Sequence, residues 1–305
     1  MDVSNLNKKL NKLNKLFWIG FYSKHYIDFI NRKKREAFLN AFSDEISPLV
    51  EKYKNYKTPN GTIGNRVWVF WYTGLETAPK IVKKCIEEMK LIKDIDLIFL
   101  DKSNLNDYFI WNDDIKSKFD NGLISVTFLT DIIRNQLMAR FGGFWFDSTL
   151  LFLDKDFIIN HKDLPYYSLK HGDYAACSHF NEGKWSSFLS GTTKGHILPS
   201  FTTDLFEWYF SKYDTIPDYF FIDYAYWIAY ESFPELKKEI DNLLCPENKD
   251  VFYIGRNIKK ACSDAKWNEV ITQNKVEKLI WKIPNADKLI SNKKGFYYRV
   301  INYGN

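Results

Sequence analysis

The stretch that most constrains the fold runs from residue 125 to residue 147 and reads SVTFLTDIIRNQLMARFGGFWFD. Leu129, Ile133 and Leu137 recur at intervals of four, which predicts a helix with one apolar face. Gly142 stands where this helix needs a C-terminal cap. The apolar segment after it predicts a buried strand that ends on Asp147. The chain must therefore turn from a helix into the interior of a sheet across two glycines.

Two earlier segments predict strands of the same sheet. NRVWVFWYTG (65–74) reads as a buried strand that runs into a glycine turn, and DIDLIFLD (94–101) reads as a second strand. Between them, APKIVKKCIEEMKLI (78–92) has helical spacing. This strand, helix, strand order is typical of a parallel βαβ unit. Further on, residues 199–211 and 222–231 predict helices, while the segments between residues 155 and 198 are compatible with strands or loops.

The first 60 residues predict a helical extension, followed by the main domain over residues 61–305. Leu6, Leu10 and Leu13 form an apolar stripe, and four lysines, at positions 8, 9, 12 and 15, occupy the other face. TPNGTIG (58–64) is rich in turn-forming residues, which suits a boundary between the extension and the main domain. Two interpretations of the extension stay open, namely packing on the main domain and docking on an anionic membrane surface.

Composition excludes several classes of protein. Hydrophobic residues make up 45% of the 305, which permits a large core and argues against a disordered chain. None of the four cysteines forms a CxxC pair, so we expect ordinary thiols in a reducing compartment. The net charge of +5 is mild and the lysines are scattered, so we expect no nucleic-acid partner. Without a signal peptide or a run of ~20 apolar residues, the expected location is cytoplasmic.

Several polar and aromatic residues are expected at one edge of the predicted sheet. In an open parallel sheet, ligands bind beyond the carboxyl ends of the strands, where Trp71, Tyr72 and Asp147 stand. Asp131 and Arg134 lie one turn apart near the start of the intervening helix, so a returning strand could bring them toward Asp147. In the alternative interpretation, Asp131 and Arg134 form a surface ion pair. Trp71 then packs in the core, and Asp147 begins a turn.

The central block TDIIRNQLMARFGGFWFDST resembles the central motif of glycosyltransferases with a DXD sugar-binding region, which include glycosyltransferase family 32 and the capsular polysaccharide synthesis proteins. Four other stretches resemble further blocks of that family, namely VWVFWYTGLETAPKIVKKCIEEM, WSSFLSGTTKGH, YFFIDYAYW and KLIWK. The likeness covers residues 66 to about 283. It implies an α/β fold of the GT-A type, a Rossmann-like mixed sheet flanked by helices, with the N-terminal helical extension added.

The resemblance also implies roles for individual residues. Trp71 would stack on the base of a nucleotide-sugar, most simply a UDP-sugar, and Tyr72 would belong to the same donor-binding site. Asp131 and Arg134 would hydrogen-bond the hydroxyls of the transferred sugar, as a carboxylate beside a guanidinium suits a polyol. Asp147 matches the first Asp of DXD, which contacts the ribose and a metal ion.

The sequence departs from the family's pattern at the second acidic position of DXD, where Thr149 stands. The resemblance implies a divalent cation, Mn²⁺ or Mg²⁺, on Asp147 and Thr149. One carboxylate and one hydroxyl form a weaker site than two carboxylates, because such cations prefer hard, charged oxygen ligands. Lys194 or Lys282 could share the neutralisation of the leaving diphosphate.

The activity that the resemblance implies is transfer of a hexose to a saccharide acceptor in capsular or surface polysaccharide synthesis, with retention of configuration. Trp281 and Lys282 would stabilise the leaving diphosphate, and Asp223 would face the acceptor. The acceptor is expected to be lipid-linked, so the N-terminal helices would contact the inner membrane face peripherally. Two alternatives are a protein-glucosylating enzyme and a non-catalytic module that binds a sugar-nucleotide or a saccharide.

Overall fold

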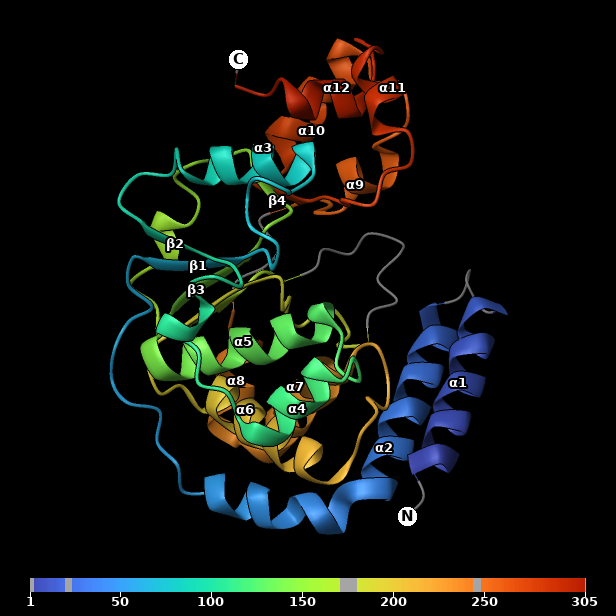
Figure 1. The fold of residues 1–305 in the computed structure, drawn as a ribbon, viewed down its shortest axis with the longest axis vertical. Coiled ribbons are helices and arrows are strands. Elements are labelled where there is room, and N and C mark those ends of the chain that lie inside the picture. The colour runs from blue at the N-terminus through green and yellow to red at the C-terminus, as the bar shows by residue number, and fades with distance from the viewer. Residues whose placement is uncertain (1–2, 20–23, 171–179, 244–247, 305) are drawn as a thin grey trace.

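The computed structural model describes residues 3–19, 24–170, 180–243 and 248–304. Five strands form its central sheet, namely β1 (Arg66–Phe70), β2 (Asp96–Leu100), β3 (Gly143–Asp147), β5 (Tyr166–Ser168) and β6 (Leu189–Thr192). They lie in the order β2-β1-β3-β6-β5, of which Figure 1 labels the first three. β2 and β3 run parallel to β1, whereas β6 is antiparallel to both β3 and β5. The predicted mixed sheet flanked by helices is confirmed.

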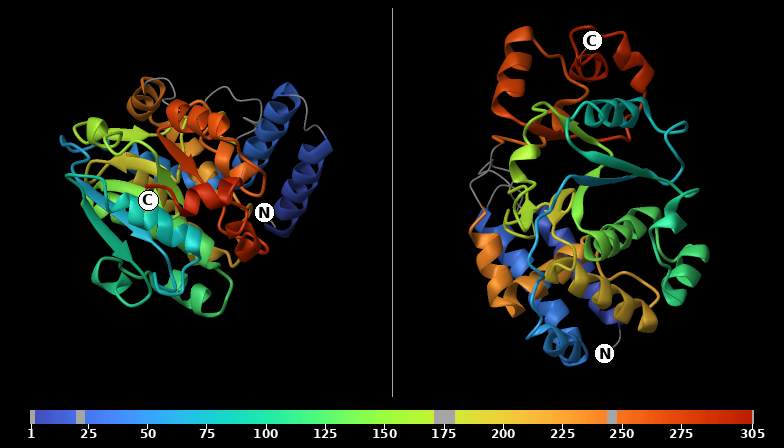
Figure 2. Two further views of the ribbon diagram at one scale, coloured as in Figure 1. Left: turned by 90° about the horizontal axis from the view of Figure 1, so that it is seen from above. Right: turned by 90° about the vertical axis from the view of Figure 1, so that its left-hand side faces the viewer.

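Alternating side chains along the strands create two cores, one on each face of the sheet. On β1, Val67 and Val69 enter one core while Trp68 and Phe70 enter the other, because successive strand residues point to opposite faces. Helices cover both faces (Figures 1 and 2). One face is covered by α3 (Lys80–Met89), α9 (Tyr253–Asn257), α10 (Asp264–Gln273), α11 (Ala286–Ile290) and α12 (Phe296–Ile301). The other is covered by α4 (Asp113–Asp120), α5 (Val126–Phe141), α6 (Ile197–Lys212), α7 (Phe221–Ser232) and α8 (Pro234–Asp241).

A small second sheet lies beside the main one. It consists of β4 (Leu150–Phe152) and β7 (Val276–Lys278), which pair antiparallel with Leu150 opposite Lys278. Two short 3-10 turns complete the regular structure of the described chain, at Leu105–Asp107 and Ile159–His161. The β4–β7 pairing was not expected from the sequence, and it carries the late residue Lys278 to the end of β3.

Helix α5 begins and ends as its sequence predicts. The Ser125 hydroxyl accepts a hydrogen bond from the Phe128 backbone N–H at 3.2 Å, which caps the first turn. At the other end, Gly142 has a φ of 69° and donates its N–H to the Met138 carbonyl at 2.9 Å. The left-handed conformation at this position favours glycine, which has no Cβ. The strand β3 then begins at Gly143.

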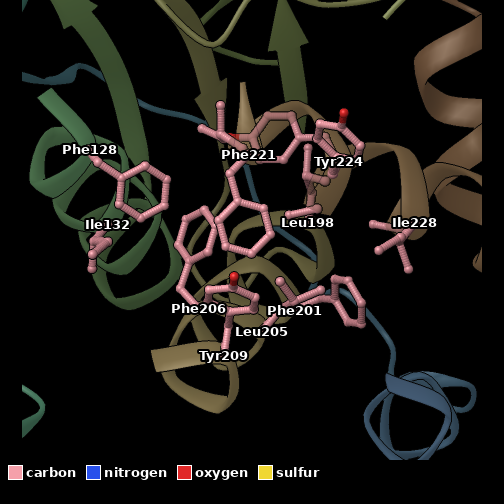
Figure 3. Packing of buried hydrophobic residues seen from close by; sticks show 14 of the residues in the cluster. Phe128, Ile132, Leu198, Phe201, Leu205, Phe206, Tyr209, Phe221, Tyr224 and Ile228 are labelled. Atoms are coloured by element: carbon pink, nitrogen blue, oxygen red, sulfur yellow. The ribbon is translucent and has the colours of Figure 1, made fainter. Parts of the chain in front are cut away.

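Much of the chain's aromatic content lies in the core between α5, α6 and α7. Phe221 of α7 lies 5.3 Å from Phe206, 4.6 Å from Tyr209 and 5.8 Å from Phe128, measured between ring centroids (Figure 3). Such ring pairs contribute about 0.5–1.5 kcal/mol each beyond the burial of their area. The cluster therefore fixes α7 against the first turn of α5.

The N-terminal region consists of α1 (Val3–Ile19) and α2 (Lys24–Tyr53), which pack against each other beside the main body (Figure 1). Leu6 and Leu10 are buried in the core shared with α6 and α7, while the lysines at positions 8, 9, 12 and 15 are exposed. The apolar stripe of α1 is therefore used for packing within the protein. Along the part of the chain that the structure describes, no helix combines the length and apolarity needed to cross a bilayer.

Cys85 and Cys262 are buried free thiols. The other two cysteines of the sequence, Cys177 and Cys245, lie outside the described residues. The expectation of ordinary thiols therefore holds for the two that can be placed.

Candidate functional site

A cavity of about 710 Å³ opens at the carboxyl ends of the parallel strands. Trp71 follows β1 directly, and Asp147 ends β3 opposite Phe70, so the two strand ends lie side by side. The first turns of α5 and α7 close the cavity from the other side. Ligands of open α/β sheets bind at this edge. The cavity is therefore the leading candidate for a functional site.

Arg134 joins two acidic residues in the floor of this cavity. Its guanidinium donates to Asp131 at 2.8 Å and to Asp147 at 3.1 Å, and it lies 5.1 Å from the centre of the Trp145 ring. Asp131 and Arg134 share a face because they are three residues apart on α5. Since β3 runs back along α5, its last residue meets the helix's first turns. The three residues that the sequence predicted to converge do so.

Lys278 is a charged residue of the site that sequence reasoning missed. Its ammonium lies 2.7 Å from an Asp147 carboxylate oxygen and 2.6 Å from the Thr149 hydroxyl. The register of β4 with β7 places it there, because Leu150, next to Thr149, pairs with Lys278. The only sequence signal was its position at the start of KLIWK, the block that also contains the predicted residues Trp281 and Lys282.

The charges around Asp147 determine its protonation state. Burial by itself would raise the pKa of this carboxyl, but the Lys278 ammonium and the Arg134 guanidinium together hold the pKa below its ordinary value. Trp145 adds a hydrogen bond of 2.9 Å to the same carboxylate. Asp147 is therefore an anion that holds two cations at the bottom of the cavity.

Two aromatic residues form a right-angled corner at the side of the cavity. The rings of Trp71 and Trp281 lie 5.2 Å apart with planes at 89°, and the Trp281 side chain is 43% exposed. Tyr72 also lines the cavity and packs on Phe119 at 5.7 Å. Partly exposed aromatic faces of this kind suit a planar base or a sugar ring.

Two predicted lysines do not lie in the cavity. Lys282 is exposed, and its ammonium lies 5.0 Å from the centre of the Trp281 ring, but it does not line the cavity. Lys194 follows β6 and lies at the amino end of β3, away from the cavity, because Thr192 pairs with Gly143 at the start of β3. Lys194 is therefore wrongly placed by the sequence interpretation, since β6 runs antiparallel to β3.

Asp223 lies in the first turn of α7 and faces the cavity without contacting the arginine cluster. One of its oxygens accepts hydrogen bonds from Trp185 at 2.8 Å and from Asn181 at 3.2 Å. Burial raises the pKa of Asp223 to about 6, because these neutral donors only partly replace water. Burial likewise raises the pKa of Asp131 to about 7, although Arg134 opposes this shift.

The N-terminal helices hold one wall of the cavity. Lys34 of α2 forms a buried ion pair with Asp218 at 3.1 Å, and Asn14 of α1 donates to the same carboxylate at 3.2 Å. Asp218 precedes Tyr219 and Phe220, which line the cavity mouth and are 68% and 48% exposed. The helices at the start of the chain therefore position residues of the site.

The predicted metal ligands, Asp147 and Thr149, do not form a suitable donor set. Both oxygens of Asp147 accept hydrogen bonds, one from Arg134 and Trp145 and the other from Lys278. The Lys278 ammonium also donates a hydrogen bond to the Thr149 hydroxyl oxygen. Among the described residues, no group of three or more His, Cys, Asp or Glu side chains could hold a metal ion. A direct cation site at this pair stays a prediction from the resemblance, and the side chains present do not fit it.

We expect Asp223→Asn to stabilise the protein near neutral pH. The carboxyl ionises with a pKa of about 6 when folded and about 3.8 when unfolded. The protonated carboxyl therefore imposes no cost on the folded state below about pH 4, and the free energy of unfolding falls as the pH rises through 6. The difference between these two pKa values corresponds to about 3 kcal/mol, which is the most that an uncharged, isosteric amide would recover.

Urea denaturation of the Asp223→Asn variant at about pH 7.5 and about pH 4 measures this effect. The gain is expected at the higher pH and should vanish at the lower one. Asp120→Asn, at an exposed ion pair with Lys116, is the matched control and should show no such gain. Equal stability of wild type and Asp223→Asn at both pH values would show that burial does not raise the pKa of Asp223.

Fold and cavity together define an α/β protein with a charged, aromatic-lined ligand site at the carboxyl edge of its parallel strands. The chain belongs to the capsular polysaccharide synthesis protein family, whose family model matches residues 19–300. No curated protein matches the sequence. A solved structure named PaToxG Glycosyltransferase is similar at 14% identity and a TM-score of 0.35, over 70% of this chain and 83% of that chain. A likeness that distant supports no conclusion about this chain.

Proposed function

We propose that the protein is a glycosyltransferase that moves a hexose from a nucleotide-sugar, UDP-linked in the simplest case, to a saccharide acceptor in capsular or surface polysaccharide synthesis. Membership of the capsular polysaccharide synthesis family supports the biological role. The observation that carries the chemistry is the cluster of Asp131, Arg134 and Asp147 at the bottom of a cavity large enough for a nucleotide-sugar.

The cluster suits a sugar because it presents acceptors and donors side by side. Asp131 offers carboxylate oxygens to sugar hydroxyls, and Arg134 offers N–H groups in a fixed planar fork. The Arg134 side chain is only 4% exposed, so its geometry is set by the protein before a ligand arrives. Preorganised groups of this kind lose little entropy on binding.

The corner of Trp71 and Trp281 suits the nucleotide base. It lies at the end of β1, beside Asp147 at the end of β3. A base stacked there would direct its diphosphate toward Asp147 and Lys278, and the sugar beyond toward Asp131 and Arg134. This order of base, phosphate and sugar supports a nucleotide-sugar over a simple saccharide.

The acceptor would approach from the mouth of the cavity. Asp223 can orient an acceptor hydroxyl as a hydrogen-bond acceptor once it is ionised. The exposed rings of Tyr219 and Phe220 provide apolar surface for a saccharide ring or the beginning of a lipid carrier. Peripheral membrane contact through the lysine face of α1 belongs to this proposal, as does retention of anomeric configuration.

The function is tested by thermal melting and turnover with a panel of UDP- and GDP-sugars. A cognate donor at about 100 times its Kd stabilises the folded state by ~2.7 kcal/mol, which raises Tm by roughly 5 °C for a chain of this size. Slow donor hydrolysis by wild type indicates an enzyme. Stabilisation without turnover toward any acceptor or water would favour a non-catalytic binding module, and no stabilisation by any donor would contradict the proposal.

A further inference from the structure

The ammonium of Lys278 occupies the space between the two oxygens where the sequence places a divalent cation. It lies 2.7 Å from Asp147 and 2.6 Å from Thr149. A cation ligated by both oxygens would have to lie within about 2.1–2.6 Å of each. Lys278 and a directly bound metal ion therefore exclude each other, and their positive charges also repel.

Within the described ranges of the chain, no further His, Cys, Asp or Glu side chain joins this pair to make up for the missing carboxylate. Position 149 is threonine, which contributes no charge, and Asp147 is already shared by Arg134, Trp145 and Lys278. The three N–H donors of a lysine ammonium leave one for a ligand, since hydrogen bonds to the described residues use two. Lys278 also lines the cavity, with its side chain 21% exposed, so a ligand can reach it.

We propose that Lys278 is the phosphate-binding cation of this site and that transfer needs no divalent metal ion. The inference rests on the proposed glycosyltransferase function and specifies how its leaving group is stabilised. A lysine is a common point-charge partner of phosphates. Here its position is fixed by the β4–β7 register and by the pair of oxygens that hold it.

The reaction balances without a cofactor. The bond between the anomeric carbon and the diphosphate oxygen breaks, and its electron pair stays on that oxygen. The acceptor hydroxyl oxygen bonds to the anomeric carbon and releases its proton to solvent. Lys278 stays protonated and donates a hydrogen bond to the departing diphosphate, whose charge increases as the bond breaks.

The test is calorimetric binding of UDP and GDP to the full chain, once with EDTA and once with MnCl₂. We expect wild type to bind one of these nucleoside diphosphates equally well under both conditions. Lys278→Gln, which keeps an N–H donor on a side chain one atom shorter but loses the charge, should weaken this binding roughly 10- to 100-fold in EDTA, as expected for loss of a charge-assisted hydrogen bond. Lys278→Ala provides the same comparison if Gln restores part of the contact.

Two controls separate a phosphate-binding role from a structural one. Lys278→Gln should bind the corresponding nucleoside, which has no phosphate, as tightly as wild type does. Lys275→Ala removes a lysine three residues away that pairs with Asp154 at 2.9 Å and does not line the cavity, and it should leave binding unchanged. Equal weakening of nucleoside and diphosphate by Lys278→Gln would assign Lys278 a structural role and overturn the inference.

The outcomes also separate this inference from the proposed function. Binding of a nucleoside diphosphate that requires MnCl₂, or that survives Lys278→Gln in EDTA, would overturn the inference and leave the glycosyltransferase proposal intact. Binding of neither UDP nor GDP under any condition, together with no stabilisation by their sugars, would overturn both.

Discussion

Replacing Arg134 with lysine is expected to reduce donor turnover roughly 10²- to 10³-fold while the protein remains folded. The guanidinium contacts Asp131 and Asp147 with two different nitrogens. A lysine keeps the positive charge between the two acids but has a single nitrogen and no planar fork. It can therefore compensate the charges without holding both carboxylates in the geometry that a sugar needs.

The choice of lysine over alanine matters for interpretation. Arg134→Ala would leave two buried carboxylates without their shared partner, and loss of one member of a buried ion pair typically costs about 3–5 kcal/mol. Loss of activity in that variant could then reflect unfolding. We still expect Arg134→Ala and Asp147→Ala to abolish transfer in whatever fraction remains folded.

The matched control for Arg134→Lys is Arg140→Lys on the same helix. Arg140 lies 4.7 Å from the centre of the Phe141 ring near the C-terminal end of α5, away from the cavity. Initial rates of donor hydrolysis and melting curves for both variants form the measurement. Near-native turnover by a folded Arg134→Lys or Arg134→Ala protein would show that the site lies elsewhere.

Gly143→Ala is expected to destabilise the protein by roughly 2–5 kcal/mol. Gly143 has a φ of 101°, and a Cβ there would lie 2.7 Å from the backbone oxygen of Arg66 on the neighbouring strand. The left-handed backbone contributes ~1–2 kcal/mol and the clash with a rigid strand contributes about 1–3 kcal/mol. The clash cannot relax easily because β1 is an interior strand, paired with β2 on one side and with β3 on the other.

Urea denaturation of Gly143→Ala beside Gly122→Ala isolates the contribution of the clash. Gly122 also has a positive φ, of 72°, but a Cβ there would meet nothing within 4 Å. The control should therefore lose only the left-handed contribution, about 1–2 kcal/mol. Equal losses in the two variants would contradict the explanation by strand contact.

Local patterns were sufficient for the βαβ unit and for the passage from α5 into β3. The four-residue interval of Leu129, Ile133 and Leu137 predicted α5, and Gly142 was correctly expected as its cap, because helix periodicity and left-handed caps depend on near neighbours in sequence. The parallel βαβ unit and the helices α6 and α7 were also predicted. The short strands β4, β5, β6 and β7 were missed or left undecided, since three or four residues carry too little pattern to separate strand from loop.

In the candidate site, too, the residues close together in the sequence were predicted and the distant one was not. Asp131 and Arg134 could be paired from sequence because they are one helical turn apart, and Asp147 could be added because the strand that follows must return along the helix. Lys278 could not be found in this way. It is 131 residues from Asp147 in the chain, and it is one of 43 basic residues, any of which could have met that carboxylate.

The amino-acid sequence by itself determined the strand, helix, strand order of β1, α3 and β2, the glycine pair that turns α5 into β3, and the acid and guanidinium on one helical face. These depend on interactions within a few residues, which the sequence lists in order. Tertiary structure alone decided that the Lys278 ammonium binds the Thr149 hydroxyl and that Lys282 lies outside the cavity. It also decided that α1 and α2 support the cavity wall through Asp218. Those contacts join distant segments, and only the packing of the complete core fixes which distant segments meet.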